Sequence, residues 1–340
     1  MSHGVVLVTG ITGFIATHTA KAFLEAGYTV KGTARSAGKA EEWISLFPAF
    51  KSKFQYAVVE DMIAPGAFDE AIKGCDIVAH IASPAHWNHT DNEKDILIPA
   101  IQGTRNLVEA TRLEPRIKRV VFTSSFASIV DPAAPPDHVH KSEDWNPVTY
   151  EEAKASSTPA FVYRSSKPLA ERAFWDYIKE EKPAWEGSAI CPCGTFGPPI
   201  HPLKSMSALN TSIQYFWNMA NGTFKSGVPA VGFPVFVDVR DVALAHVRAV
   251  ELDAAKGQRY LLIGGTYKPE LFVDVMGRTH PELKADKLAE VDVSKVKLDT
   301  SFKYDNSKAQ KDLNLTFTSL DKMVADTLDR LLLLEKELPK

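Results

Sequence analysis

The first half of the sequence alternates short valine-rich runs with longer amphipathic stretches. Five runs have apolar residues at consecutive positions, which is typical of strands buried on both faces: 5–10, 28–35, 54–61, 76–83 and 119–125. The stretches between them have helical periodicity: 13–26, 38–47, 65–73 and 91–113. This βαβα order predicts an α/β domain with a doubly wound parallel sheet and right-handed crossovers.

Composition limits the kinds of partner that the protein can have. The chain has 340 residues, of which 45% are hydrophobic and 24% charged, so it can bury a large core. Its net charge of −3, with both signs mixed, offers no basic stripe for nucleic acid and no polybasic patch for a membrane. No apolar run reaches the roughly 18 residues of a membrane span, and the first predicted strand leaves no room for a signal peptide. We therefore expect a cytoplasmic monomer or homodimer that binds small molecules.

The three cysteines, Cys75, Cys191 and Cys193, are sparse and odd in number. A disulfide framework needs a denser and even set, so buried thiols in a reducing compartment fit better. We expect no structural disulfide.

The segment VTGITGFIATH joins the first predicted strand to the first predicted helix. Gly10 can take a backbone conformation closed to other residues, and Gly13 lets the chain approach a pyrophosphate at the positive end of the helix. Ala16 is the third small residue, so the spacing is Gly-x-x-Gly-x-x-Ala rather than Gly-x-Gly-x-x-Gly. Two glycines also occur in ordinary tight turns, but the strand before and the helix after favour a Rossmann-like dinucleotide-binding fold.

The alternation weakens after a polar, proline-rich segment at 126–160, which is too long for a simple connection and is expected to lie beside a site. A helix at about 161–181 and a strand at 187–197 follow, and 236–252 and 258–265 look like a return to the sheet domain. We predict a dinucleotide-binding domain of residues 1–198 plus 233–265. The remaining residues, 199–232 plus 266–340, are predicted to form a smaller, discontinuous substrate-binding domain.

The end of the second predicted strand distinguishes NAD from NADP, because NAD enzymes commonly present an Asp or Glu there to the ribose 2′-hydroxyl. This strand ends in KGTARSAGK, with Arg35 where the acid is expected and Lys39 four residues later. A planar guanidinium and an ammonium suit an adenosine 2′-phosphate. A solvated basic turn is the plainer interpretation, but we favour NADP(H) as the cofactor.

Tyr163 and Lys167, in the stretch YRSSKPLAER, are at positions i and i+4 and would share one helix face. A tyrosine titrates near ~10, too high for acid chemistry at neutral pH, and a neighbouring ammonium favours the phenolate. The spacing is common by chance. However, the strand VVFTSS ends in Ser124 and Ser125 at the predicted carboxyl edge of the sheet, where α/β proteins bind ligands. A serine there would hold a carbonyl oxygen while the tyrosine protonates it, although serines at strand ends are also common caps.

Four motifs in the same order resemble those of the extended short-chain dehydrogenase/reductases: TGITGFIA, VVFTSS, YRSSK and DVRDVA. The chain is most similar to the branch of the dihydroflavonol reductases and the yeast methylglyoxal/isovaleraldehyde reductases, through stretches such as ARSAGKAE, EDWNP, SSKPLAE and LNTS. The resemblance implies NADPH-dependent reduction of aldehydes or ketones. The substrate-facing residues match no one member closely, so it does not identify the substrate.

The resemblance also implies roles for individual residues. Ser125, Tyr163 and Lys167 match the catalytic serine, the general acid and the lysine that holds the nicotinamide ribose. The implied cofactor contacts are Gly10, Ile11, Thr12, Gly13, Phe14 and Ile15 at the pyrophosphate, Arg35 and Lys39 at the 2′-phosphate, Asp61 and Met62 at the adenine, Ala82 and Ser83 at the middle of the cofactor, and Pro192, Thr195 and Ser212 near the nicotinamide.

Pro168 departs from the family pattern, in which a non-proline residue follows the lysine. Proline removes one backbone donor and crowds the carbonyl of Arg164. We expect the helix either to begin only a few residues before Pro168 or to bend near Arg164, with Tyr163 and Lys167 still on one face.

Other groups of residues give weaker evidence for a functional site. His86 with His89 and His138 with His140 have spacings seen at metal sites, but no ligand cluster accompanies them at zinc-like intervals, so we interpret them as solvated loop histidines. The hydrolase motif Gly-x-Ser-x-Gly is absent. Seven aromatic residues could line an apolar pocket but are more readily explained as core: Phe126, Phe161, Phe196, Tyr215, Phe216, Trp217 and Phe233.

The sequence therefore predicts an NADPH-dependent carbonyl reductase. A sugar-nucleotide epimerase with bound NAD or a hydroxysteroid dehydrogenase is the alternative within the family, because both share the serine, tyrosine and lysine. A non-catalytic module that senses NADP is the alternative from another class, although such proteins tend to have lost the tyrosine and the lysine.

Overall fold

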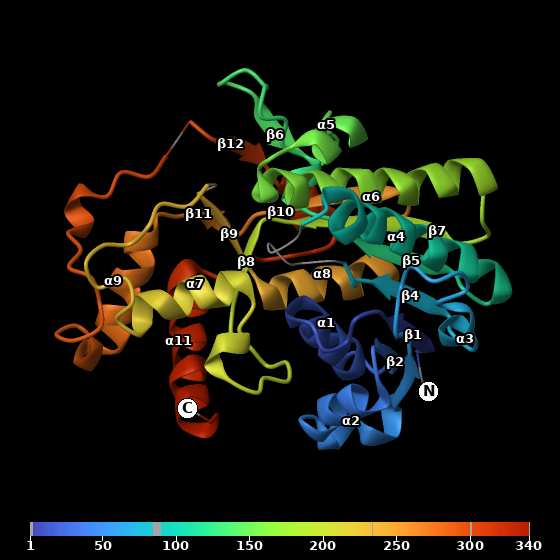
Figure 1. Ribbon diagram of the computed structural model, residues 1–340, viewed down its shortest axis with the longest axis horizontal. Coiled ribbons are helices and arrows are strands. Elements are labelled where there is room, and N and C mark those ends of the chain that lie inside the picture. Colours follow the sequence, from blue (N-terminus) through green and yellow to red (C-terminus); the bar gives the residue numbers. More distant parts are fainter. Residues whose placement is uncertain (1–2, 84–89, 233, 300, 340) are drawn as a thin grey trace.

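The computed structural model describes residues 3–83, 90–232, 234–299 and 301–339 (Figure 1). Within these residues, seven parallel strands form the central sheet in the order β3-β2-β1-β4-β5-β7-β10. They are β1 (Val5–Val8), β2 (Thr29–Ala34), β3 (Phe54–Val58), β4 (Ile77–His80), β5 (Arg119–Thr123), β7 (Glu186–Pro192) and β10 (Gln258–Leu262). The order reverses between β1 and β4, and such a switch point is where doubly wound sheets bind ligands. The predicted α/β fold is confirmed.

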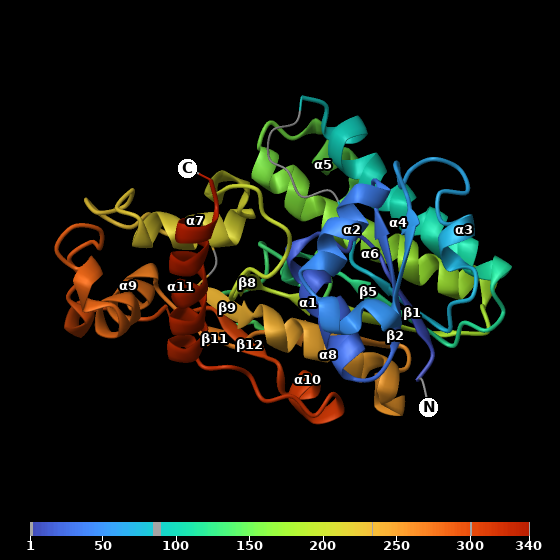
Figure 2. The same ribbon diagram turned by 90° about the horizontal axis from the view of Figure 1, so that it is seen from below.

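Helices cover both faces of this sheet (Figures 1 and 2). One layer contains α1 (Phe14–Glu25), α2 (Ala37–Ser45) and α8 (Val239–Glu251), and the other contains α3 (Asp69–Ile72), α4 (Ile98–Ala110) and α6 (Pro159–Glu181). Successive side chains of a strand point to opposite faces, so Val6 and Val8 pack into the first layer and Leu7 into the second. This two-sided burial explains why the strands are apolar at consecutive positions.

Another hydrophobic cluster lies beside the sheet and draws on α7 (Thr211–Ala220), α9 (Pro269–Thr279) and α11 (Leu320–Glu337). Figure 2 shows these three helices at one end of the molecule, away from α3. The cluster draws mainly on residues 203–231 and 267–338, together with Phe14, Phe196, Phe236 and Val239 of the predicted dinucleotide-binding domain. The domain boundaries themselves stay a prediction.

Two smaller sheets complete the described fold. The strands β8 (Gly194–Phe196), β9 (Val235–Asp238) and β11 (Gly265–Thr266) form one, and β6 (Val139–Lys141) pairs in parallel with β12 (Lys303–Asp305). We expected 236–252 to return to the sheet domain. Its helix α8 does return and packs on α1, whereas β9 joins the smaller sheet. The short helices α5 (Tyr150–Ala155) and α10 (Ser307–Asp312) lie in the connecting segments.

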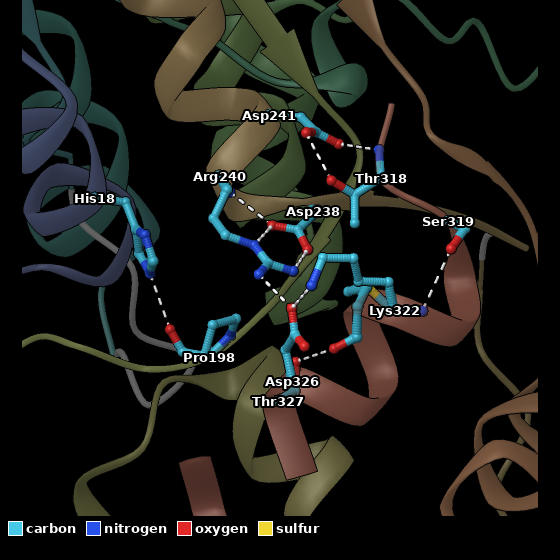
Figure 3. Close-up of polar contacts among 11 residues, drawn as sticks. His18, Pro198, Asp238, Arg240, Asp241, Thr318, Ser319, Lys322, Asp326 and Thr327 are labelled. Carbon is cyan, nitrogen blue, oxygen red and sulfur yellow. Dashed lines mark hydrogen bonds and ion pairs between the residues drawn. The ribbon is translucent and has the colours of Figure 1, made fainter. Parts of the chain in front are cut away.

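The DVRDVA motif fastens α8 to α11 (Figure 3). Asp238 has a buried side chain and caps α8 by accepting a hydrogen bond from the amide of Arg240 at 2.8 Å. The guanidinium of Arg240 then bridges Asp238 (2.6 Å) and Asp326 of α11 (2.5 Å). Asp241 accepts from the amide and the hydroxyl of Thr318, which precedes α11, at 2.7 and 2.9 Å. The motif therefore positions the C-terminal helix.

Two further expectations concern the chain as a whole. Cys75, Cys191 and Cys193 are buried and free, as expected. Within the described residues, none of the helices has both the length and the apolar character required to cross a membrane.

Candidate functional site

The glycine turn connects β1 to α1 at the switch point. Gly10 has a φ of +67°, and a Cβ atom there would lie 3.1 Å from the Cβ of Ala82, so a larger residue would strain the backbone and press on the segment after β4. Gly13 is the N-cap of α1, and among the described residues no side chain caps this helix and no acid lies in its first turn. The first amides of α1 and the positive end of its dipole therefore suit the pyrophosphate of a dinucleotide.

Thr9 and His80 connect this turn to the segment that follows β4. The hydroxyl of Thr9 accepts from the amides of Ile81 and Ala82, both at 2.9 Å, and lies 2.9 Å from His80 Nδ1. The two amides occupy both lone pairs of the hydroxyl, so Thr9 uses its proton to donate to His80 Nδ1. The imidazole then carries its own proton on Nε2. Burial and the nearby charge of Lys167 lower the pKa of His80 to about 3, so the imidazole is neutral. No sequence motif pointed to this pair.

The residues after β2 provide the positive charge expected of a site that binds a 2′-phosphate. Arg35, directly after β2, and Lys39, in the first turn of α2, are exposed, and neither has an ion-pair partner among the described residues. Asp61 and Met62 follow β3, which pairs with β2, so they lie along the same edge of the sheet. Asp61 accepts from the amide of Ile63 at 3.0 Å and is itself exposed.

Lys167 is at the centre of the predicted proton-transfer set. Its Nζ donates to Ser83 Oγ at 2.8 Å and lies 4.6 Å from the centre of the Tyr163 ring. Lys167 is only 9% exposed, which strengthens its electrostatic interactions. The two side chains face one another across one turn of α6, as their spacing predicts. Through Ser83, the segment after β4 also contacts Lys167.

Pro168 lies inside α6, which begins at Pro159 and continues to Glu181. The first expected arrangement, a helix beginning only a few residues before Pro168, is therefore wrong. Pro159 occupies the first turn, where a missing amide costs little. The bend near Arg164 stays a prediction.

Ser124 and Ser125 follow β5 at the carboxyl edge of the sheet, but they make different contacts. The hydroxyl of Ser125 is half-buried and accepts from the amide of Ala127 at 3.1 Å, so it caps the short 3₁₀ turn Phe126–Ser128, which packs against α6. An accepting hydroxyl keeps its own proton, and Ser125 can donate it to a substrate oxygen. Ser124 instead bonds to Ser128, at 2.8 Å, and to Glu171.

A buried ion pair behind these serines was missed by sequence reasoning. Glu171 of α6 has a fully buried side chain and pairs with Arg259 of β10 (Oε1 to Nε, 2.5 Å). The same carboxylate accepts from Trp175 Nε1 at 3.1 Å, and the Arg259 guanidinium lies 3.7 Å from the ring centre of Trp145. The pair therefore ties α6 to the edge strand of the sheet and to the polar segment after β5.

The residues predicted near the nicotinamide lie at the end of β7, in β8 and at the start of α7. Ser212, in the first turn of α7, donates to the carbonyl of Thr195 at 2.7 Å, and Thr195 donates to the carbonyl of Cys193 at 3.0 Å. β7 ends at Pro192 and pairs with β5, with Ile190 opposite Thr123. This segment therefore borders the end of β5.

The remaining expectations can now be compared with the structure. Phe126, Phe196, Phe216 and Trp217 are buried core residues, as favoured, and Phe161 and Tyr215 are half-buried. Phe233, His86 and His89 lie outside the described residues. The interpretation of His140 as a solvated loop residue is wrong, because it is only 7% exposed.

Comparison with known proteins places the chain in a family. Residues 6–264 match the model of the NAD dependent epimerase/dehydratase family. The chain is 41% identical to an uncharacterized oxidoreductase of Schizosaccharomyces pombe, over 97% of this chain and 98% of that one, and 40% identical to a ketoreductase of Aspergillus niger, over 96% and 97%. The crystal structure of yeast methylglyoxal/isovaleraldehyde reductase complexed with NADPH matches with a TM-score of 0.89 at 32% identity and covers 98% of this chain and 100% of that chain. The protein therefore belongs to the NAD-dependent epimerase/dehydratase family, and the predicted resemblance is confirmed.

Proposed function

We propose that this protein is an NADPH-dependent carbonyl reductase that converts an aldehyde or ketone to an alcohol. The observation that carries the proposal is the position of Lys167, whose ammonium joins Ser83, at the switch point, to the ring of Tyr163. The ketoreductase of A. niger and the yeast reductase with NADPH are relatives over nearly the whole chain, and they support the same activity here.

The residues present fit NADPH. Gly10 and Gly13 open the N-terminus of α1 to a pyrophosphate, and Arg35 and Lys39 offer two cations to a 2′-phosphate. Lys167 would donate to the ribose hydroxyls from the place where it now meets a serine hydroxyl. When bound, NADPH supplies the hydride that reduces the carbonyl carbon.

Three side chains would act on the carbonyl oxygen. Ser125 donates a hydrogen bond that orients it, and Tyr163 gives it the phenolic proton as negative charge develops. The ammonium of Lys167 stabilises the resulting phenolate from a point 4.6 Å from the ring centre. The carbon gains the hydride, the oxygen gains the proton, and solvent returns a proton to Tyr163.

NADPH consumption with a panel of aldehydes, diketones, ketoesters, dihydroflavonols and steroid ketones tests the proposal, with NADH in parallel. We expect turnover of at least one carbonyl class with NADPH preferred. A purified protein that carries stoichiometric NAD would favour the epimerase alternative instead. NADPH binding without consumption across the panel would favour the sensing module.

We also propose that the protein works in the cytosol as a monomer or homodimer. The three buried, free cysteines support a reducing compartment. Cell fractionation and light scattering of the purified protein test these two statements separately.

A further inference from the structure

Two histidines beside β6 lie in the polar segment between β5 and α6. Residues 131–144 contain four carboxylates and one lysine, an excess of negative charge. His138 and His140 are two positions apart on an extended chain and lie on the same side of it, with ring centres 4.8 Å apart. A turn closed by the Asp144 amide on the Lys141 carbonyl, at 3.1 Å, brings the Asp144 carboxylate back to His138, where Oδ2 and Nε2 are 2.7 Å apart.

This group has the composition of a metal site. One ring nitrogen from each histidine and one oxygen of Asp144 all lie within 4.8 Å of one another, and the described part of the chain contains no second such group. His140 is only 7% exposed, and its Nδ1 has no hydrogen-bond partner among the described residues. A buried polar atom without a partner costs about 1–3 kcal/mol, which a ligand at this position would offset.

We propose that His138, His140 and Asp144 bind one divalent first-row transition metal ion of the zinc type, with water completing the coordination. Imidazole nitrogens and a carboxylate oxygen are ligands that zinc takes at about 2.0–2.2 Å, which places the ligand atoms of a tetrahedral site roughly 3.3–3.5 Å apart. His138 Nε2 and Asp144 Oδ2, now 2.7 Å apart, would therefore open around the ion, and any wider separation within the group would close. The ion would replace the proton between His138 and Asp144. Asp131 adds negative charge in the surroundings of His140.

An ion here would stiffen the support of the candidate active site without touching the reacting atoms. The carbonyl of Asp144 accepts from Arg259 at 2.5 Å. Two residues further on, the backbone amide of Asn146 donates to the carbonyl of Ser128, and its side-chain Nδ2 donates to the carbonyl of Ala127, both at 3.0 Å. Those carbonyls belong to the turn that follows Ser125. The ion would therefore fix the loop that holds this turn in place.

Titration of tag-free, chelator-treated protein with Co²⁺ and with Zn²⁺ tests the proposal. We expect one equivalent to bind, with the visible absorption of a four-coordinate Co²⁺ site that Zn²⁺ displaces, and with a higher melting temperature. His140→Gln and Asp144→Asn should each weaken binding at least about 100-fold, because even loss of a partner outside the ligand shell costs about 10–100-fold. His280→Gln is the matched control, since His280 pairs with Asp329 at 3.1 Å but belongs to no three-ligand group in the described residues. It should bind Co²⁺ as the unaltered protein does.

Circular dichroism and NADPH binding show whether each variant is folded. If a variant is unfolded, imidazole nitrogen NMR of the unaltered protein decides instead, because Zn²⁺ must then shift the His138 and His140 signals. Absence of stoichiometric binding, equal binding by His140→Gln, or NMR shifts confined to other histidines would overturn the proposal.

Discussion

At the residue scale, the proposed chemistry depends on a few polar atoms at the carboxyl edge of the sheet. Lys167 Nζ contacts Ser83 Oγ and faces the ring of Tyr163. In the proposed reaction, a buried ammonium in that position stabilises the phenolate that is left after Tyr163 donates its proton. Ser125 keeps a donatable proton because its oxygen accepts from Ala127.

Tyr163→Phe removes the proton donor and leaves the ring. We expect kcat for carbonyl reduction to fall by about 10²–10⁴-fold, the usual contribution of a general acid, while NADPH binds as before. Steady-state kinetics and a fluorescence titration with NADPH measure the two effects. The matched control is Tyr56→Phe, which alters an exposed tyrosine bonded to Glu41 at 3.2 Å and should keep full activity. A Tyr163→Phe protein with an undiminished rate would disprove the assigned role.

Replacing both Arg35 and Lys39 by alanine should change cofactor preference rather than chemistry. Hydrogen bonds to charged groups contribute about 1.5–3 kcal/mol each, so KM for NADPH should rise at least about tenfold while KM for NADH changes little. Kinetics with both cofactors measure the difference. Lys51→Ala, at an exposed lysine elsewhere, is the control. Parallel loss of affinity for NADH and NADPH would contradict a 2′-phosphate role.

Residue pairs differ in how far the sequence could predict them. Tyr163 and Lys167 are one helical turn apart, so helix geometry alone brings them together. Glu171 and Arg259 are separated by 88 positions. No local pattern links such partners, because only the pairing of strands and the packing of α6 bring them into contact.

At the scale of elements, the Glu171–Arg259 pair holds α6 against the sheet. Glu171→Gln keeps the shape but leaves a buried guanidinium without its counter-ion, which typically costs about 3–5 kcal/mol. Urea denaturation should show this loss in the free energy of unfolding. Asp321→Asn breaks the exposed pair with Arg278 and should cost under about 1 kcal/mol. Equal effects of the two substitutions would show that the buried pair has no special role.

The predicted elements succeeded where burial was strong and failed where local turn chemistry intervened. Four of the five strands of the first half, β1, β2, β4 and β5, are largely buried, which explains their apolar runs, whereas β3 lies at the edge of the sheet with much of its surface exposed. The helix predicted at 65–73 is reduced to α3, since Pro65 and Gly66, with a φ of +70°, form a turn. The helix predicted at 91–113 begins with a π-helical turn over Glu93–Leu97, just before Pro99, which cannot donate a backbone hydrogen bond.

At the scale of the whole molecule, four of the five buried histidines in the described residues, all except His140, have pKa values far below the ordinary one. Burial lowers the pKa of His80 to about 3 and the pKa values of His18, His201 and His246 to about 4. His246 of α8 contacts the Val242 carbonyl through Nδ1 at 2.8 Å and the Thr123 hydroxyl of β5 through Nε2 at 2.7 Å, so Nδ1 carries the proton and Nε2 accepts. Charging His246 would place a proton on the nitrogen that accepts from Thr123 and would break this contact.

These histidines predict a loss of stability in mild acid. An unfolded chain binds protons at histidine near pH ~6.5, whereas the folded protein resists them down to about 4. Their contribution is therefore complete above about pH 6.5 and falls as the pH drops toward 4, by at most about 1.4 kcal/mol per pH unit for each histidine.

Urea denaturation across this pH range measures the slope. His246→Gln replaces a titrating ring by an amide that can still donate to the Val242 carbonyl and accept from Thr123, so the slope of unfolding free energy against pH should fall by about one proton. His3→Gln, at an exposed position, should leave the slope as it is. An unchanged slope in His246→Gln would mean that its ring is protonated as readily in the folded protein as in the unfolded chain, and that the contact between α8 and β5 does not depend on a neutral imidazole.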